Sequence, residues 1–169
     1  MSQVTNSQNI NSIMNNIDLG PTQSIQLMFA KLQLAQSEIC KNQANEYMNE
    51  ITQIQDKQKE CAEMISRARE LQNKAKTDGG TTQMPADMVK YFNDNGLAIE
   101  NTGKDNYHNK DEWDYNLKSL TNFQEQIGTK TQTLMVYLQD FIGQYNSYLQ
   151  GANKAITDSN QTLQSIIAR

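Results

Sequence analysis

The chain has 169 residues and a formal net charge of −4, and 37 % of its residues are hydrophobic. That share is below the roughly 45–50 % typical of globular domains, so one domain or one elongated unit with a modest core is expected. Asn and Gln, 39 residues together, supply the polar balance, which suits long helices with uncharged outer faces. The negative charge argues against nucleic acid and against an anionic membrane surface as partners.

The first 20 residues are polar and begin MSQVTNSQNINSIMNN. They lack the basic n-region and the apolar h-region of a Sec signal peptide, so residues 1–20 are predicted to form a flexible arm. No stretch of the chain approaches the roughly 18 consecutive apolar residues of a membrane-spanning helix, so no direct membrane insertion is expected.

A first long helix is predicted over residues 21–76, because Pro21 can open it and no Gly or Pro follows until TDGGTT. Apolar positions step by four and three residues, as in a coiled-coil heptad, at Cys40, Ala44, Tyr47, Ile51, Ile54, Gln58, Cys61, Ile65 and Ala68. A second register upstream, joined to the first by a stutter between residues 39 and 40, contains Ile25, Met28, Leu32, Ala35 and Ile39. Cys40 and Cys61 lie about 30 Å apart on this helix, so we expect two small buried side chains and no disulfide.

A connector is predicted over residues 77–111, which are rich in Gly, Asn and Asp. It contains a short amphipathic helix over residues 85–95, whose buried face would hold Met88, Val89 and Phe92. A connector of this length is too long for a plain turn. It is a small cap domain, a disordered loop or a functional insertion.

A second long helix is predicted over residues 112–169. Its three-four alternation holds across fifteen positions, from Leu117 to Ile166. Two long helices with such patterns predict an all-α fold, a long antiparallel coiled-coil hairpin joined by the small irregular or helical connector.

Beside this pattern, further apolar residues recur at every seventh position. Together the two patterns make an apolar strip that is wider than a two-helix hairpin requires. A third helix of the same chain could cover it, but we favour packing against other chains. Gly143 and Gly151 lie off the hairpin seam and would admit a neighbouring subunit. The predicted self-assembly strip consists of Leu134, Met135, Leu138, Phe141, Ile142, Gly143, Tyr145, Tyr148, Leu149, Gly151, Ala152, Ile156 and Leu163.

The sequence offers no pattern of catalytic residues. His108 is the sole histidine, which excludes a His-based triad or a multi-histidine metal site within one chain, and we expect it in a solvated loop. The nearby Asp105, Asp111 and Asp114 do not have EF-hand spacing. No Gly-rich loop has the Lys and spacing of a P-loop, and Trp113 is predicted to be a packing anchor. We therefore predict no enzyme, no cofactor and no catalytic or metal-binding residue.

Two segments, IQLMFAKLQLAQSE (residues 25–38) and QMPADMVKYFNDNGLAIENTG (residues 83–103), resemble the corresponding parts of the EspA and SseB type III secretion filament proteins. Those proteins have an LMF-type stretch followed by AQS, then a short helix opened by Pro and an acidic residue, and finally a long coiled-coil helix. The similar segments occur in the same order as in those proteins, and the resemblance spans most of the chain.

The resemblance implies a secreted, extracellular subunit that leaves through the type III apparatus, guided by residues 1–18, and polymerises into a filament between the needle and the translocation pore. Its implied partners are further copies of the chain, a cytosolic type III secretion chaperone, the needle subunit and the hydrophobic translocators. The seam that the hairpin or the chaperone would cover comprises Ile25, Met28, Leu32, Ile39, Tyr47, Ile51, Ile54 and Ile65. The alternatives are a needle-tip cap of the IpaD and LcrV kind, and an intracellular coiled-coil adaptor or chaperone.

Overall fold

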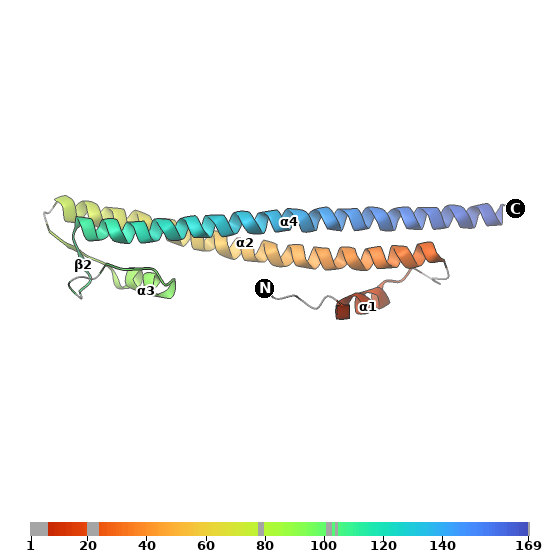
Figure 1. Ribbon diagram of the computed structural model, residues 1–169, viewed down its shortest axis with the longest axis horizontal. Coiled ribbons are helices and arrows are strands. Elements are labelled where there is room, and N and C mark those ends of the chain that lie inside the picture. Colours follow the sequence, from red (N-terminus) through yellow and green to blue (C-terminus); the bar gives the residue numbers. More distant parts are fainter. Residues whose placement is uncertain (1–6, 20–23, 78–79, 101–102, 104, 169) are drawn as a thin grey trace. The chain divides into compact units, whose positions relative to one another are not determined.

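The computed structural model describes residues 7–19, 24–77, 80–100, 103 and 105–168. The elements in chain order are α1 (Ser7–Asn16), α2 (Ile25–Thr77), β1 (Thr82–Gln83), α3 (Ala86–Asp94), β2 (Tyr107–His108) and α4 (Lys110–Ile167) (Figure 1). The chain divides into two compact units. Unit 1 consists of the described parts of Met1–Glu50 and Leu134–Arg169, and unit 2 of those of Ile51–Thr133. Both α2 and α4 contribute to each unit.

Within unit 1, α2 and α4 run antiparallel and side by side. The Cys40 thiol lies 3.8 Å from the Gln144 side-chain oxygen, and the Tyr47 ring stacks on Phe141 at 5.6 Å between centroids. Within unit 2 the same two helices again pack together, and the Cys61 thiol donates to the Leu120 carbonyl at 3.5 Å. The prediction of an all-α fold with a pair of long helices is confirmed.

The predicted seam of α2 is buried from Cys40 to Ala68, except that Tyr47 and Gln58 are half-buried. Upstream, the buried positions Ala30 and Ser37 continue the same three-four spacing, and Ala35 of the predicted second register is buried as well. Ile25 and Met28 are 84 % and 57 % exposed and do not belong to the intramolecular seam. The reason is that α2 and α4 meet here through small side chains, which leaves larger ones on the flanks. Leu32 and Ile39 on those flanks are half-buried.

The connector forms a packed cap on unit 2. Met88 and Phe92 of α3 are fully buried, as predicted, and Val89 is half-buried. Gly96, with φ of 64°, ends α3 while the Leu97 amide donates to the Phe92 carbonyl at 2.8 Å, which is the bonding of a Schellman motif. Two short strands absent from the prediction pair antiparallel, with Thr82 opposite His108. The described part of the connector is therefore a small cap, and the alternative of a disordered loop does not apply to it.

The ends of the helices differ from the predicted boundaries in two informative ways. Ser7–Asn16 form α1 where a flexible arm was expected, because Ile10, Ile13, Met14 and Ile17 recur at helical spacing and are half-buried. α4 begins two residues early because the Asn109 side chain accepts bonds from the next helical amides, while Glu112 accepts the Asn109 amide at 2.8 Å. This is a capping box. Residues 1–6, 20–23, 78–79, 101–102, 104 and 169 of the predicted segments lie outside the described residues.

Candidate assembly surface

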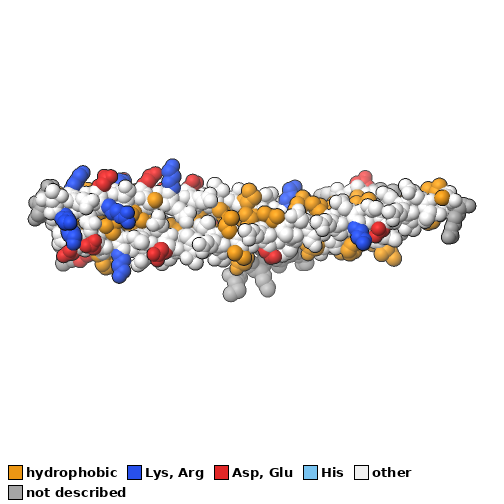
Figure 2. Space-filling view, turned by 90° about the horizontal axis from the view of Figure 1, so that it is seen from above, with side chains coloured by type: hydrophobic (Ala, Val, Ile, Leu, Met, Phe, Trp, Pro, Cys, Tyr) orange, Lys and Arg blue, Asp and Glu red, His pale blue; other side chains and the backbone are white. Residues whose placement is uncertain are grey.

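Large apolar side chains are exposed mainly on unit 1. Of the thirteen such residues among those described, only Tyr107 and Tyr115 belong to unit 2. The space-filling view shows the apolar side chains of one face (Figure 2). The eleven residues on unit 1 are Ile25, Met28, Phe29, Met48, Met135, Val136, Tyr137, Ile142, Leu163, Ile166 and Ile167.

Charge is distributed in the opposite way. Unit 1 carries 10 charged residues among its 86, and unit 2 carries 24 among its 83. On the face drawn in Figure 2, most blue and red side chains lie over unit 2. From Leu134 to Ile167, the only charged residues of α4 are Asp140, Lys154 and Asp158. A second molecule could cover this surface at little cost, because few charges would lose their hydration.

The predicted self-assembly strip divides into three groups. Met135, Ile142, Gly143 and Leu163 are exposed and available to a neighbour. Leu134 and Ala152 are buried between α2 and α4, so they belong to the core of the hairpin and not to its surface. The half-buried remainder comprises Leu138, Phe141, Tyr145, Tyr148, Leu149, Gly151 and Ile156.

α1 covers part of the strip within the same chain. Ile13 of α1 and Ile17, which directly follows α1, line a hollow together with Leu34 of α2 and with Tyr145 and Leu149 of α4. A third helix in cis was the alternative explanation for the apolar strip, and it holds for this turn of α4. The neighbouring strip residue Ile142 remains 44 % exposed.

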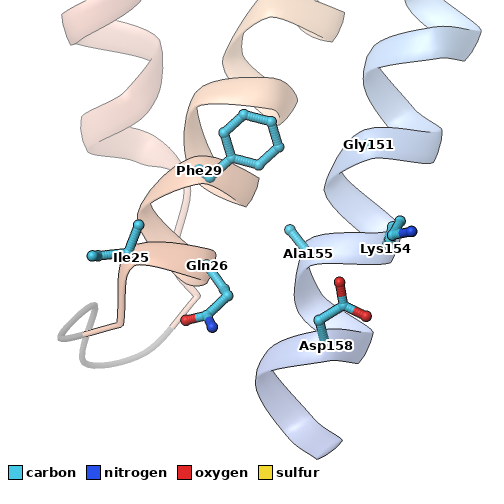
Figure 3. Close-up of a pocket in the computed structure, with 7 residues that line it drawn as sticks. All are labelled: Ile25, Gln26, Phe29, Gly151, Lys154, Ala155 and Asp158. Atoms are coloured by element: carbon cyan, nitrogen blue, oxygen red, sulfur yellow. The ribbon is translucent and has the colours of Figure 1, made fainter. Parts of the chain in front are cut away.

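A second, open groove lies between the beginning of α2 and the last third of α4 (Figure 3). It has a volume of about 720 Å³ and is lined by Ile25, Gln26, Phe29, Gly151, Lys154, Ala155 and Asp158. Sequence patterns along single helices could not reveal it, because its two walls are more than 100 residues apart in the chain.

The two glycines of the strip have different surroundings. A Cβ at Gly151 would lie 3.1 Å from the side-chain oxygen of Gln33, so this glycine permits close packing within the chain. A Cβ at Gly143 would meet no atom within 4 Å. Of the two, only Gly143 has open space for the predicted approach of another subunit.

His108 is buried, which corrects the expectation of a solvated loop. It is 1 % exposed, its ring packs edge-on against Trp113 at 5.2 Å, and its Nε2 atom has no hydrogen-bond partner among the described residues. Burial lowers the pKa of the imidazole, and the carboxylates of Glu112, Glu100 and Asp105 partly offset this shift. The pairing of β2 with β1 draws residue 108 inward. Trp113 is the predicted packing anchor, and its indole N–H donates to the Thr82 hydroxyl at 2.8 Å.

Cys40 and Cys61 are free and buried, as predicted, and burial raises the pKa of both thiols, which disfavours the reactive thiolate. Among the described residues, no three His, Cys, Asp or Glu side chains group closely enough to hold a metal ion. None of the described helices combines the length and the apolar character that crossing a membrane requires.

A comparison of the chain with protein-family models, with curated proteins and with solved structures gives no match. Its function must therefore be inferred from its own residues.

Proposed function

We propose that the chain is a non-enzymatic structural subunit that polymerises through the surface of unit 1. The observation that carries this proposal is the concentration of eleven exposed large apolar side chains on a unit with few charges. Large apolar side chains that gather on one surface of a protein commonly mark an interaction site. Burial of each additional Ile or Leu side chain by a neighbour is worth about 1.5–3 kcal/mol.

The geometry of the strip suits repeated copies. Met135, Ile142 and Leu163 recur at multiples of seven residues along one side of α4 and are exposed. A helix neighbour can follow such a side over several turns, as in a coiled coil. A contact between two different surfaces of the same protein generates an open filament when its rotation does not close a ring.

The resemblance to the EspA and SseB proteins supports a more specific form of this proposal. The chain would be secreted by a type III secretion system and form an extracellular filament that extends the needle and links it to the translocon. Its partners would be the needle subunit and the hydrophobic translocators. A cytosolic chaperone would cover exposed side chains such as Ile25 and Met28 until export.

Replacement of Ile142 by Asp tests the assembly. Ile142→Asp should abolish polymers in negative-stain microscopy and in sedimentation, because it places a charge in the apolar contact, while circular dichroism stays helical. Asn122→Asp is the matched control, since it adds the same charge at an exposed position of the same helix that belongs to unit 2. Normal polymers from Ile142→Asp would exclude the strip as the contact.

The form of the wild-type particles separates the alternatives. Filaments support the proposal, whereas closed rings favour a tip cap of the IpaD and LcrV kind. If the protein stays monomeric, and if residues 1–18 do not direct its secretion into the medium, the alternative of an intracellular adaptor or chaperone is favoured.

A further inference from the structure

We propose that the last eight residues of α4 in one copy lie in the groove of the next copy, so that copies join head to tail in a parallel, staggered arrangement. This segment, residues 160–167, is called the α4 tip. The inference rests on the proposed self-assembly and names the two surfaces that meet in it.

The α4 tip extends past the beginning of α2. Ser24, just before α2, lies opposite Ser159, with 3.4 Å between the hydroxyl oxygens. α4 continues for eight residues beyond that point, or about 12 Å. Every residue of the tip is exposed, and Leu163, Ile166 and Ile167 are 52 %, 65 % and 83 % exposed.

The groove offers an apolar site of matching character. Ile25 and Phe29 form its α2 wall, and Gly151 and Ala155 lie on its α4 side (Figure 3). Lys154 and Asp158 also line the groove. Their charges lie on the same helix side, one turn apart, and provide polar groups beside the apolar walls, as interfaces commonly have.

The α4 tip has the pattern of a helix that binds in a groove. Leu163, Ile166 and Ile167 follow the i, i+3, i+4 spacing of the anchors in such complexes. The tip sequence NQTLQSII contains no charged residue, so its burial requires no desolvation of a charge.

The groove and the tip of one molecule cannot meet each other. Gln33 lies beside Gly151 and Ser24 beside Ser159, so this antiparallel register places Phe29 near the level of Ala155. Leu163 is eight residues further along α4, about 12 Å away. The tip that fills the groove must therefore belong to a second copy.

The two surfaces differ, which determines how the contact propagates. Each copy would contact one neighbour through its tip and the other through its groove. One tip and one groove would remain free, at opposite ends of the polymer. Such a heterologous contact continues indefinitely unless it closes a ring, whereas a two-fold antiparallel exchange of tips stops at two copies.

Cysteine cross-linking in the full chain tests this arrangement. Phe29→Cys and Leu163→Cys are combined with Cys40→Ala and Cys61→Ala, which remove the native thiols. Because the two new thiols are too far apart to bridge within one molecule, oxidation during assembly should give a ladder of dimers, trimers and larger species on non-reducing gels. The variants with only one new cysteine should give no ladder.

A second measurement uses substitution in place of cross-linking. Ile166→Asp should raise the protein concentration needed for assembly about tenfold or more, since it removes an apolar anchor worth at least that factor. Gln161→Asp, on another side of the same tip, should leave this concentration unchanged.

The outcomes separate this inference from the proposed function. If the wild-type chain polymerises but the variant with both new cysteines gives no cross-links, or only cross-linked dimers, the tip-in-groove contact is overturned while self-assembly stands. A wild-type chain that remains monomeric at all concentrations overturns both.

Discussion

Unit 2 encloses its large side chains, and unit 1 displays them. The eight largest fully buried side chains among the described residues, which include Trp113, Phe92 and Met88, all belong to unit 2. The buried residues of unit 1 are mostly small, such as Ala30, Ala152 and Ser159. The same two helices therefore build one unit with a complete core and one whose apolar surface remains available to a partner.

The difference follows from what packs on the helix pair. In unit 2, α3 and the paired strands supply Met84, Met88 and Phe92 as a further layer, and Arg67 of α2 holds Asp87 of α3 in an ion pair with atoms 2.6 Å apart. In unit 1, the described residues provide only the short α1 as a third helix. An apolar helix pair without a full third layer is suited to complete its core with neighbouring molecules.

The largest difference between the two units is expected in the loss of folding stability when a phenylalanine of each unit is replaced by alanine. Phe92→Ala should lower the free energy of unfolding by about 3–5 kcal/mol, because it leaves a cavity in the fully buried core of unit 2. Phe29→Ala should change it by less than about 0.5 kcal/mol, since Phe29 is exposed. Denaturant titrations followed by Trp113 fluorescence and circular dichroism would measure both.

Equal losses from the two variants would mean that unit 1 contains a core of its own involving Phe29, and the contrast between the units would fail. The Phe29 variant should instead affect assembly, because its side chain lines the groove.

A smaller loss of folding stability is expected when the pH is lowered, through His108 of unit 2. Burial lowers the pKa of His108 below its ordinary value of 6.5. Above pH 6.5 the imidazole is neutral in both states. As the pH falls from 6.5 towards the folded-state pKa, the unfolded chain gains a proton that the folded chain does not, so folding stability decreases by up to about 1.4 kcal/mol per pH unit.

His108→Phe keeps an aromatic ring against Trp113 and cannot be protonated. The slope of unfolding free energy against pH between 6.5 and 5 should therefore be smaller in this variant than in the wild type. Identical slopes would show that other groups cause the acid sensitivity.

The sequence predicted the features that depend on local patterns. Heptad spacing from Cys40 to Ala68 identified the buried side of α2, and Pro85 with Asn95-Gly96 bounded α3 to within one residue at each end. Met88 and Phe92 were correctly placed in the core for the same reason: amphipathic spacing fixes which side of a helix faces inward.

The features that were missed depend on contacts between distant residues. The burial of His108 results from the pairing of β2 with β1, and two-residue strands have no periodic signal. The exposure of Ile25 results from where α4 places small residues. α1 is the exception, since Ile10, Ile13, Met14 and Ile17 carry a helical pattern that the polar composition of the arm obscured. The groove needs two helices at once and was outside the reach of single-helix patterns.

The smallest effect concerns the two glycines of unit 1. Gly143→Ala should raise the free energy of unfolding by about 0.5–1 kcal/mol, because alanine favours the helix and its Cβ meets no atom within 4 Å. Gly151→Ala should gain less, since its Cβ would displace the Gln33 amide. Gly143→Leu should weaken polymerisation, measured by sedimentation, while the monomer stays folded. Unchanged polymerisation would mean that no neighbour approaches α4 closely at Gly143, and that the open space there lies outside the contact between copies.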